Sequence, residues 1–187
     1  MDIRTKLSAK FYFGEDDKHM TIRNATQNDV SAIEYVYECA RGYMRSHGNM
    51  TQWLNGYPYP EVIDADINAG NLYVVEDDEG IYGVFAFVPG EDPTYAVIEN
   101  GSWLNSKPYY AIHRVASSGR KKGVFYAAFE FCSQRSDQLR IDTHEDNITM
   151  QRAVEKCGFV RCGTIYTWDS SPRIAYHYDG EVNQKAE

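Results

Sequence analysis

Residues 117–123, with the sequence SSGRKKG, combine glycines, hydroxyl groups and three adjacent cations between a predicted strand and a predicted helix. Unpaired N–H groups in the first turn of a helix, the positive end of its dipole and flexible glycines together suit a pyrophosphate. Lys121 and Lys122 would add positive charge, and Arg120 has the planar fork that grips phosphate oxygens. A basic turn facing solvent explains the same composition, so this segment alone leaves both interpretations open.

Two other nucleotide-binding motifs are absent from the sequence. No GxxxxGK precedes a Ser or Thr, and GRKKG does not match GxGxxG. The kinase and dehydrogenase classes therefore lose support, and a nucleotide-dependent enzyme is a remote alternative.

Length, composition and charge narrow the class of protein. The 187 residues are 43% hydrophobic and 25% charged, which is ordinary for one globular domain. The net charge of -8 has the wrong sign for binding nucleic acid as a main activity. Apolar runs near 81–88 and 124–132 are shorter than the roughly 18 residues that cross a bilayer, so no membrane association is expected. The four cysteines form no CxxC pair and the N-terminus lacks the apolar core of a secretory signal, so we expect a cytoplasmic protein.

Hydrophobic periodicity and turn residues divide the chain into elements. Residues 1–19 are aperiodic and are interpreted as a leader of doubtful order, which leaves residues 20–187 as a single domain. The elements predicted in the first half are a strand at 21–25, a helix from 30 to 46–48, a loop at 48–60, a helix at 61–69 and a hairpin with strands at 71–76 and 81–88.

The second half begins with a long connection at 89–108, in which one short strand is predicted at 95–99. The elements predicted after it are strands at 109–116 and 139–143, helices at 124–132 and 147–156, and closing strands at 159–168 and 173–178. This order predicts an α/β fold in which helices cover a mixed sheet.

The order of these segments resembles the GNAT superfamily of N-acetyltransferases. Arg120, Gly123 and Phe125 occupy the positions of that family's acyl-CoA pyrophosphate loop, although Phe125 is larger than the small residue expected there. Asn147 and the K-x-G-F run at 156–159 match the downstream family pattern. The resemblance covers about residues 21–178.

The resemblance implies a central mixed, mostly antiparallel sheet with a splayed parallel pair and helices on both faces. Acetyl-CoA would lie in the opening between the strand ending at Val115 and the strand 139–143, with Asn147 facing the pantetheine arm. Asn147 also reads as a plain helix cap. The acetyl-CoA-binding residues that the resemblance implies are Val115, Ala116, Ser117, Arg120, Lys121, Lys122, Gly123, Val124 and Asn147.

The implied reaction is attack of a neutral amine on the thioester carbonyl, for which a base is useful. Candidates are His113, whose ordinary pKa suits neutral pH, and Glu99, whose loop we expect to approach the cleft; a hydrogen-bonded structural His and a solvated Glu are the alternatives. Many family members protonate the leaving thiolate with a tyrosine where this chain has Val154. Cys157 and Tyr166 are substitutes to consider, though both fit a core or a strand better.

Acceptor recognition in this family usually involves the loop between the first two helices. Here that loop supplies the expected substrate-binding residues Asn49, Gln52, Trp53 and Tyr57, and its aromatics would equally form a lid on the sheet. His144 has no second His at ligand spacing, so no metal site is expected.

The sequence thus predicts an N-acetyltransferase that moves an acetyl group from acetyl-CoA to a small-molecule or peptide amine. The alternative is a noncatalytic acyl-CoA-binding or sensor module. Exposed tyrosines and two C-terminal strands would permit a homodimer.

Overall fold

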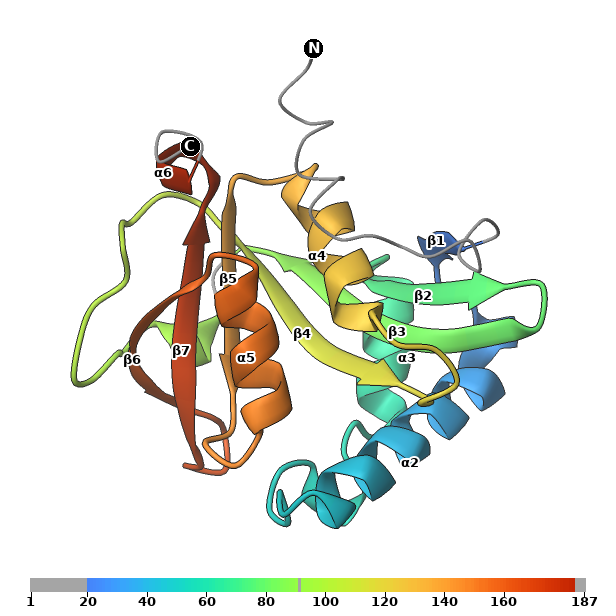
Figure 1. The fold of residues 1–187 in the computed structure, drawn as a ribbon. Coiled ribbons are helices and arrows are strands. Elements are labelled where there is room, and N and C mark those ends of the chain that lie inside the picture. The colour runs from blue at the N-terminus through green and yellow to red at the C-terminus, as the bar shows by residue number, and fades with distance from the viewer. Residues whose placement is uncertain (1–19, 91, 184–187) are drawn as a thin grey trace.

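The computed structural model describes residues 20–90 and 92–183. The interpretation of residues 1–19 as a leader lies outside the described residues. Within them, one sheet has the order β1-β2-β3-β4-β5-β7-β6 (Figure 1). Its strands are β1 (Thr21–Asn24), β2 (Leu72–Asp77), β3 (Gly80–Pro89), β4 (Tyr110–Ser117), β5 (Gln138–Thr143), β6 (Val160–Tyr166) and β7 (Pro172–Asp179). All neighbours pair antiparallel except β4 and β5, which confirms the predicted mixed, mostly antiparallel sheet.

Helices α2 (Val30–Ser46) and α3 (Pro60–Asn68) cover one face of the sheet. The capping box between Thr26 and Asp29 precedes α2, and the helix buries Ile33, Val36, Tyr37 and Met44 along one stripe. Ile33, Val36 and Tyr37 pack with Val74 and Val84 of the sheet in one core cluster. The predicted helix at 30–46 is therefore confirmed.

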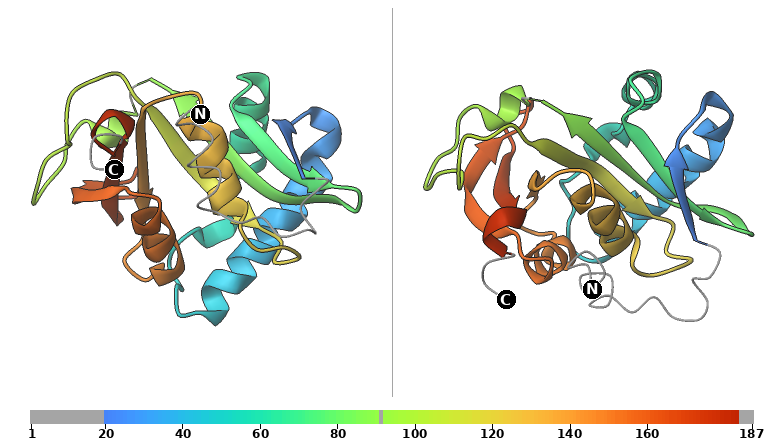
Figure 2. Two further views of the ribbon diagram at one scale, coloured as in Figure 1. Left: turned by 45° about the horizontal axis from the view of Figure 1, so that its top comes forward. Right: turned by 90° about the horizontal axis from the view of Figure 1, so that it is seen from above.

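Helices α4 (Val124–Ser133) and α5 (Ile148–Lys156) cover the other face (Figure 2), as predicted, and a short helix α6 (Gly180–Asn183) follows β7. Close approach of α4 to β3 depends on Gly83, because a Cβ there would lie 2.7 Å from Val124 Cγ1. None of the helices in residues 20–90 and 92–183 is long and apolar enough to cross a membrane.

The parallel pair β4 and β5 is joined only at one end. Register pairs are limited to Tyr110 with Leu139 and Ala111 with Arg140, after which the strands diverge (Figure 1). A register shift opposite Phe85 and the positive φ of Arg114, 52°, mark a β-bulge in β4 just beyond the last pair. A bulge bends its strand and increases the local twist, so it widens the opening. The splayed pair expected from the family resemblance is present.

The strand predicted at 95–99 is wrong. The segment starts with a 3₁₀ helix (Pro93–Tyr95), which Asp92 caps by accepting a hydrogen bond from Thr94 N at 2.8 Å. Proline fixes φ and removes an N–H group, so it favours this turn over a strand. Only Glu99 forms a β-bridge here, with Thr164.

Candidate active site

A cavity of about 1260 Å³ opens where β4 and β5 diverge. Its walls include residues 112–117 of β4, 121–126 at the start of α4, 141–143 of β5, 51–55 and 57 between α2 and α3, and 167–169 between β6 and β7. This volume exceeds that of an ordinary small-ligand pocket, so it can hold two ligands side by side.

The loop from β4 to α4 forms one end of this cavity. Ser118 N donates to Tyr82 O at 2.9 Å, which ties the loop to β3. Gly123 precedes α4 with φ 92°, a conformation that a residue with a Cβ rarely adopts. Because the first turn of a helix leaves N–H groups without intrahelical partners, the start of α4 at Val124 offers amides to an anion at this end.

The three cations of this loop differ in whether their side chains line the cavity. Arg120 turns away to Asp77 Oδ1 at 2.8 Å and Gly80 O at 2.8 Å, and its side chain does not line the cavity. Lys121 lines the cavity while its Nζ lies 2.8 Å from Asp77 Oδ2. Hydrogen bonds from Arg120 and Lys121 hold the pKa of Asp77 well below its usual range. Lys122 is exposed at the rim, so backbone amides and Lys122 are better placed for phosphate than Arg120.

Asn147 lies on the β5 side of the opening, which we call the far arm, and contacts both α5 and the loop that follows α2. Its Oδ1 accepts from Met150 N at 3.1 Å, so the helix-cap interpretation is confirmed. Its Nδ2 donates to Gln52 Oε1 at 3.1 Å. Asn49 donates to the same Gln52 oxygen at 2.7 Å. The structure thus places Gln52 and Asn147 in the cavity wall but leaves Asn49 outside it, 2% exposed and holding the loop.

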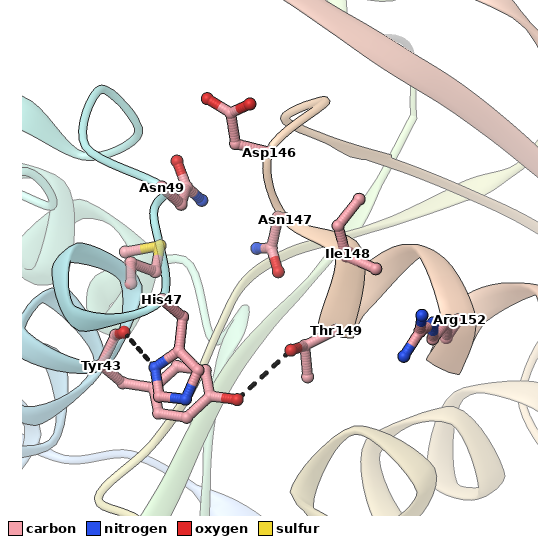
Figure 3. A pocket seen from close by; sticks show the side chains of 9 residues that line it. Tyr43, His47, Asn49, Asp146, Asn147, Ile148, Thr149 and Arg152 are labelled. Atoms are coloured by element: carbon pink, nitrogen blue, oxygen red, sulfur yellow. Dashed lines mark hydrogen bonds between the residues drawn. The ribbon is translucent and has the colours of Figure 1, made fainter.

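A smaller pocket of about 180 Å³ lies beside this arm, between the end of α2 and the start of α5 (Figure 3). Asn49 lines this pocket and not the large cavity. Figure 3 shows Tyr43 of α2 reaching Thr149 of α5, whose hydroxyl groups lie 3.2 Å apart. Thr51 Oγ1 and His144 Nε2 form a second contact at 3.1 Å, so His144 serves the loop structurally.

The aromatic residues of the same loop line the large cavity as expected. Trp53 packs edge-on against Tyr37 with ring centroids 5.7 Å apart, and it also contacts the core cluster under α2. The Tyr57 hydroxyl accepts from Arg114 Nη1 at 3.4 Å. Both residues therefore combine lid packing with cavity lining, and the two interpretations are not exclusive.

His113 lies on the other side of the opening from α4 and α5. Ile112 packs beneath those helices, so the next side chain on the strand points to the opposite face. His113 Nε2 lies 3.0 Å from Asp92 Oδ2, at ion-pair distance without the alignment of a regular hydrogen bond. Its Nδ1 lies 3.8 Å from Asp142 Oδ1, which accepts a hydrogen bond from Tyr95 at 2.7 Å.

Asp92 is held in its ionised form beside this imidazole. Burial opposes ionisation, but interaction with His113 and hydrogen bonds from Thr94 lower the pKa of Asp92 to about 2. A carboxylate against one ring nitrogen fixes the orientation of the imidazole. His113 thus has the surroundings of a proton acceptor at the cavity wall.

Known structures share this arrangement of strands and helices. The structure of a GNAT-family acetyltransferase from Streptococcus agalactiae 2603 matches with a TM-score of 0.78 and 30% identity, over 86% of this chain and 95% of that chain. The chain belongs to the GNAT family of acetyltransferases.

More distant structures share the fold. A GNAT-family acetyltransferase from Listeria monocytogenes 4b F2365 has a TM-score of 0.64 at 19% identity, over 84% of this chain and 93% of that chain. An N-acetyltransferase from Staphylococcus aureus Mu50 has a TM-score of 0.55 at 17% identity, over 87% of this chain and 99% of that chain. No protein-family model matches the chain, and no curated protein sequence does.

The second base candidate in this GNAT chain is not brought to the cavity. Glu99 is exposed, does not line the cavity and accepts a hydrogen bond from Tyr166 at 3.0 Å. Our expectation that its loop brings it to the cleft is therefore wrong, because the bridge to Thr164 holds Glu99 against β6.

Val154, where many GNAT members have a tyrosine, is fully buried in the core under α5. Neither substitute considered for its missing hydroxyl lies in the cavity wall. Burial raises the pKa of Cys157 to about 12, and Tyr166 is engaged with Glu99.

Sequence reasoning missed many residues of the GNAT cavity wall, among them Asp92, Tyr126, Asp142 and Trp168. Asp142 had a usable signal, since it follows the apolar Ile141 on a strand and therefore points to the face opposite the core helices. Asp92 gave only a local turn signal before Pro93, and its approach to His113 is a long-range contact.

Proposed function

We propose that the protein is an acetyl-CoA-dependent N-acetyltransferase whose acceptor is a primary amine. The observation that carries the proposal is the single cavity with an amide-rich helix start at one end and His113 at the other wall. The opening between β4 and β5 connects the two.

The residues present fit acetyl-CoA, which would supply the activated acetyl group. Strand pairing of β4 with β5 stops at Ala111, so the β4 edge at Val115, Ala116 and Ser117 is not covered by β5 and suits the amides of pantetheine. Gly123 and the α4 start would hold the pyrophosphate, with Lys121 and Lys122 adding charge. Asn147 lies in the wall beside the same path.

His113 would act as the proton acceptor for the amine. An ammonium cannot attack a carbonyl, so one proton must leave the nitrogen first. His113 faces the cavity with Asp92 behind one ring nitrogen, which would stabilise the imidazolium formed by that transfer. Since Val154 supplies no hydroxyl, the leaving thiolate would take its proton from water.

A thiol-release assay with acetyl-CoA and a panel of amines tests the proposal, run beside calorimetric binding of CoA. Turnover of any amine class supports the transferase. Binding without turnover favours the alternative, a noncatalytic acyl-CoA-binding module. The buried Val154, which supplies no hydroxyl to protonate the thiolate, is the observation that supports this alternative. Absence of CoA binding refutes both.

The variant Gly123→Val tests the cofactor end separately. The positive φ at position 123 and the added side chain would disturb the amides at the α4 start, so we expect CoA affinity to fall about tenfold. Gly70→Ala is the matched control, because Gly70 also has a positive φ, 70°, in open space away from the cavity. Equal CoA affinity in both variants would remove the helix start from the binding site.

A further inference from the structure

The charged groups of the large cavity are separated by sign. The side chains in its wall near α4 and α5 include the cations of Lys122 and Arg152, together with Lys121, which pairs with Asp77. Arg114 lines the opposite wall, where Asp66 of α3 neutralises it through two contacts at 2.8 and 2.9 Å. The end near α4 and α5 therefore suits phosphate.

The face that carries His113 has the opposite charge. Three carboxylates line it, those of Asp92, Asp142 and Asp169. Apart from the paired Arg114, the guanidinium that lines this face is that of Arg173, which lies 3.9 Å from Asp142 Oδ2. Three negative charges and one positive charge leave two negative charges on this face when His113 is neutral.

Two carboxylates of this face, those of Asp92 and Asp169, are held ionised. The pKa of Asp92 is lowered to about 2 despite its burial. Hydrogen bonds from Thr167 Oγ1 at 2.7 Å and Ser171 N at 3.0 Å lower the pKa of Asp169, and the nearby charge of Arg173 adds to this effect. These two charges are therefore present across the whole neutral range.

An exposed tryptophan stands beside the outer carboxylate. Trp168 is 82% exposed at the turn between β6 and β7 and lines the cavity next to Asp169. Aromatic faces attract alkylammonium groups, and Trp is the strongest of them. An unpacked Trp beside a carboxylate at a cavity rim is a suitable place for a second cationic group.

We propose that the acceptor is an aliphatic amine that carries a second cationic group. Its reacting nitrogen lies at Nδ1 of His113, the ring nitrogen that Asp92 does not contact, and its second charge lies at Asp169 and Trp168. This inference rests on the proposed acetyl transfer, and it adds the substrate class and the residues that select it.

The transfer conserves atoms and releases one proton. His113 takes one proton from the ammonium, and the freed lone pair forms the C–N bond to the thioester carbonyl. The C–S bond then breaks, the nitrogen releases its second proton, and the thiolate takes up one proton as CoA leaves. One proton passes from His113 to water in each cycle.

A matched set of probes tests the charge requirement: 1,4-diaminobutane, butylamine and 4-aminobutanoate with acetyl-CoA. We expect kcat/KM for diaminobutane to exceed that for butylamine about tenfold, and 4-aminobutanoate to be the poorest, because only its far end is repelled. Asp169→Asn and Trp168→Ala should each reduce the diaminobutane-to-butylamine ratio about threefold. Asp64→Asn, an exposed carboxylate of α3 away from the cavity, should leave that ratio unchanged.

Equal rates for the three probes, or a ratio that neither variant changes, would overturn the inference while acetyl transfer stands. If no amine is turned over, acetyl transfer fails, and calorimetry of diaminobutane with CoA-saturated protein decides the inference. Binding weakened by Asp169→Asn but not by Asp64→Asn supports the cationic site, and absent binding overturns it.

Discussion

Gly83 controls how closely α4 approaches the sheet, and Gly83→Ala tests whether that approach positions the cofactor end. A Cβ at this position would lie 2.7 and 2.9 Å from the two γ-methyl groups of Val124 and 3.1 Å from Val75 Cβ. The shortest of these is about 0.7 Å inside the 3.4 Å at which ordinary contact begins. Overpacking of this kind costs about 1–3 kcal/mol, and Val124 cannot easily rotate away because it is β-branched.

We expect Gly83→Ala to lower the free energy of unfolding by about 2 kcal/mol in urea titrations. CoA affinity should fall as well, because Val124 is the first residue of α4 and its displacement moves the helix start. The control is Val124→Ala, which removes both methyl groups and by itself costs about 1.6 kcal/mol of burial.

A double-mutant cycle then gives the decisive result. In the Val124→Ala background, Gly83→Ala should cost less, because the two nearest atoms are gone and only Val75 Cβ at 3.1 Å remains. The coupling energy should be about 1–2 kcal/mol. A wild-type free energy of unfolding for Gly83→Ala, or the same loss in both backgrounds, would refute the steric argument. Loss of stability with unchanged CoA affinity would refute the idea that the contact of Gly83 with Val124 positions the start of α4 for CoA binding.

Two further expectations concern buried charge. Asp66→Asn should lower the free energy of unfolding by about 3–5 kcal/mol in denaturant titrations, because it leaves the Arg114 guanidinium buried without its carboxylate. The control is Asp64→Asn on the same helix, which should change that free energy by under about 0.5 kcal/mol. Burial and the charge of Arg140 lower the pKa of His177 from 6.5 to about 4. The folded state thus disfavours the protonated form, so stability present above pH 6.5 should be lost by about 3 kcal/mol as the pH falls to about 4. His177→Gln should flatten that slope in a pH series of urea titrations, and an unchanged slope would contradict the assignment.

Local sequence was sufficient where an element carries its own signals. For α5, Asn147 caps the start, the apolar residues recur at helical spacing, and Gly158 with φ 88° ends the helix. The hairpin of β2 and β3 likewise follows from the acidic turn that ends in Gly80. These segments need no distant partner to specify their form.

Prediction failed where distant contacts decide the conformation. Tyr95 fits a strand by composition, yet it is 2% exposed in a 3₁₀ turn because its hydroxyl reaches Asp142 and its carbonyl accepts from Trp103. Loop position and side-chain polarity alone predict Glu99 and Asn49 in the site. A bridge to β6 holds Glu99 away from the large cavity, and Asn49 is buried beneath the loop outside the cavity wall.

The width of the opening depends on the same loop that sequence reasoning assigned to the acceptor. Past Ala111 no strand hydrogen bonds join β4 to β5, and each arm is fixed on its outer side by β3 or β7. Side-chain contacts from the α2 region reach the far arm at three points, through Tyr43 to Thr149, Thr51 to His144 and Gln52 to Asn147. Gln52 therefore cannot be assigned to the acceptor alone, because its side-chain oxygen already holds the residue expected beside pantetheine. A substitution there should alter cofactor and acceptor binding together, which separates it from Asp169, whose effect should be confined to the acceptor.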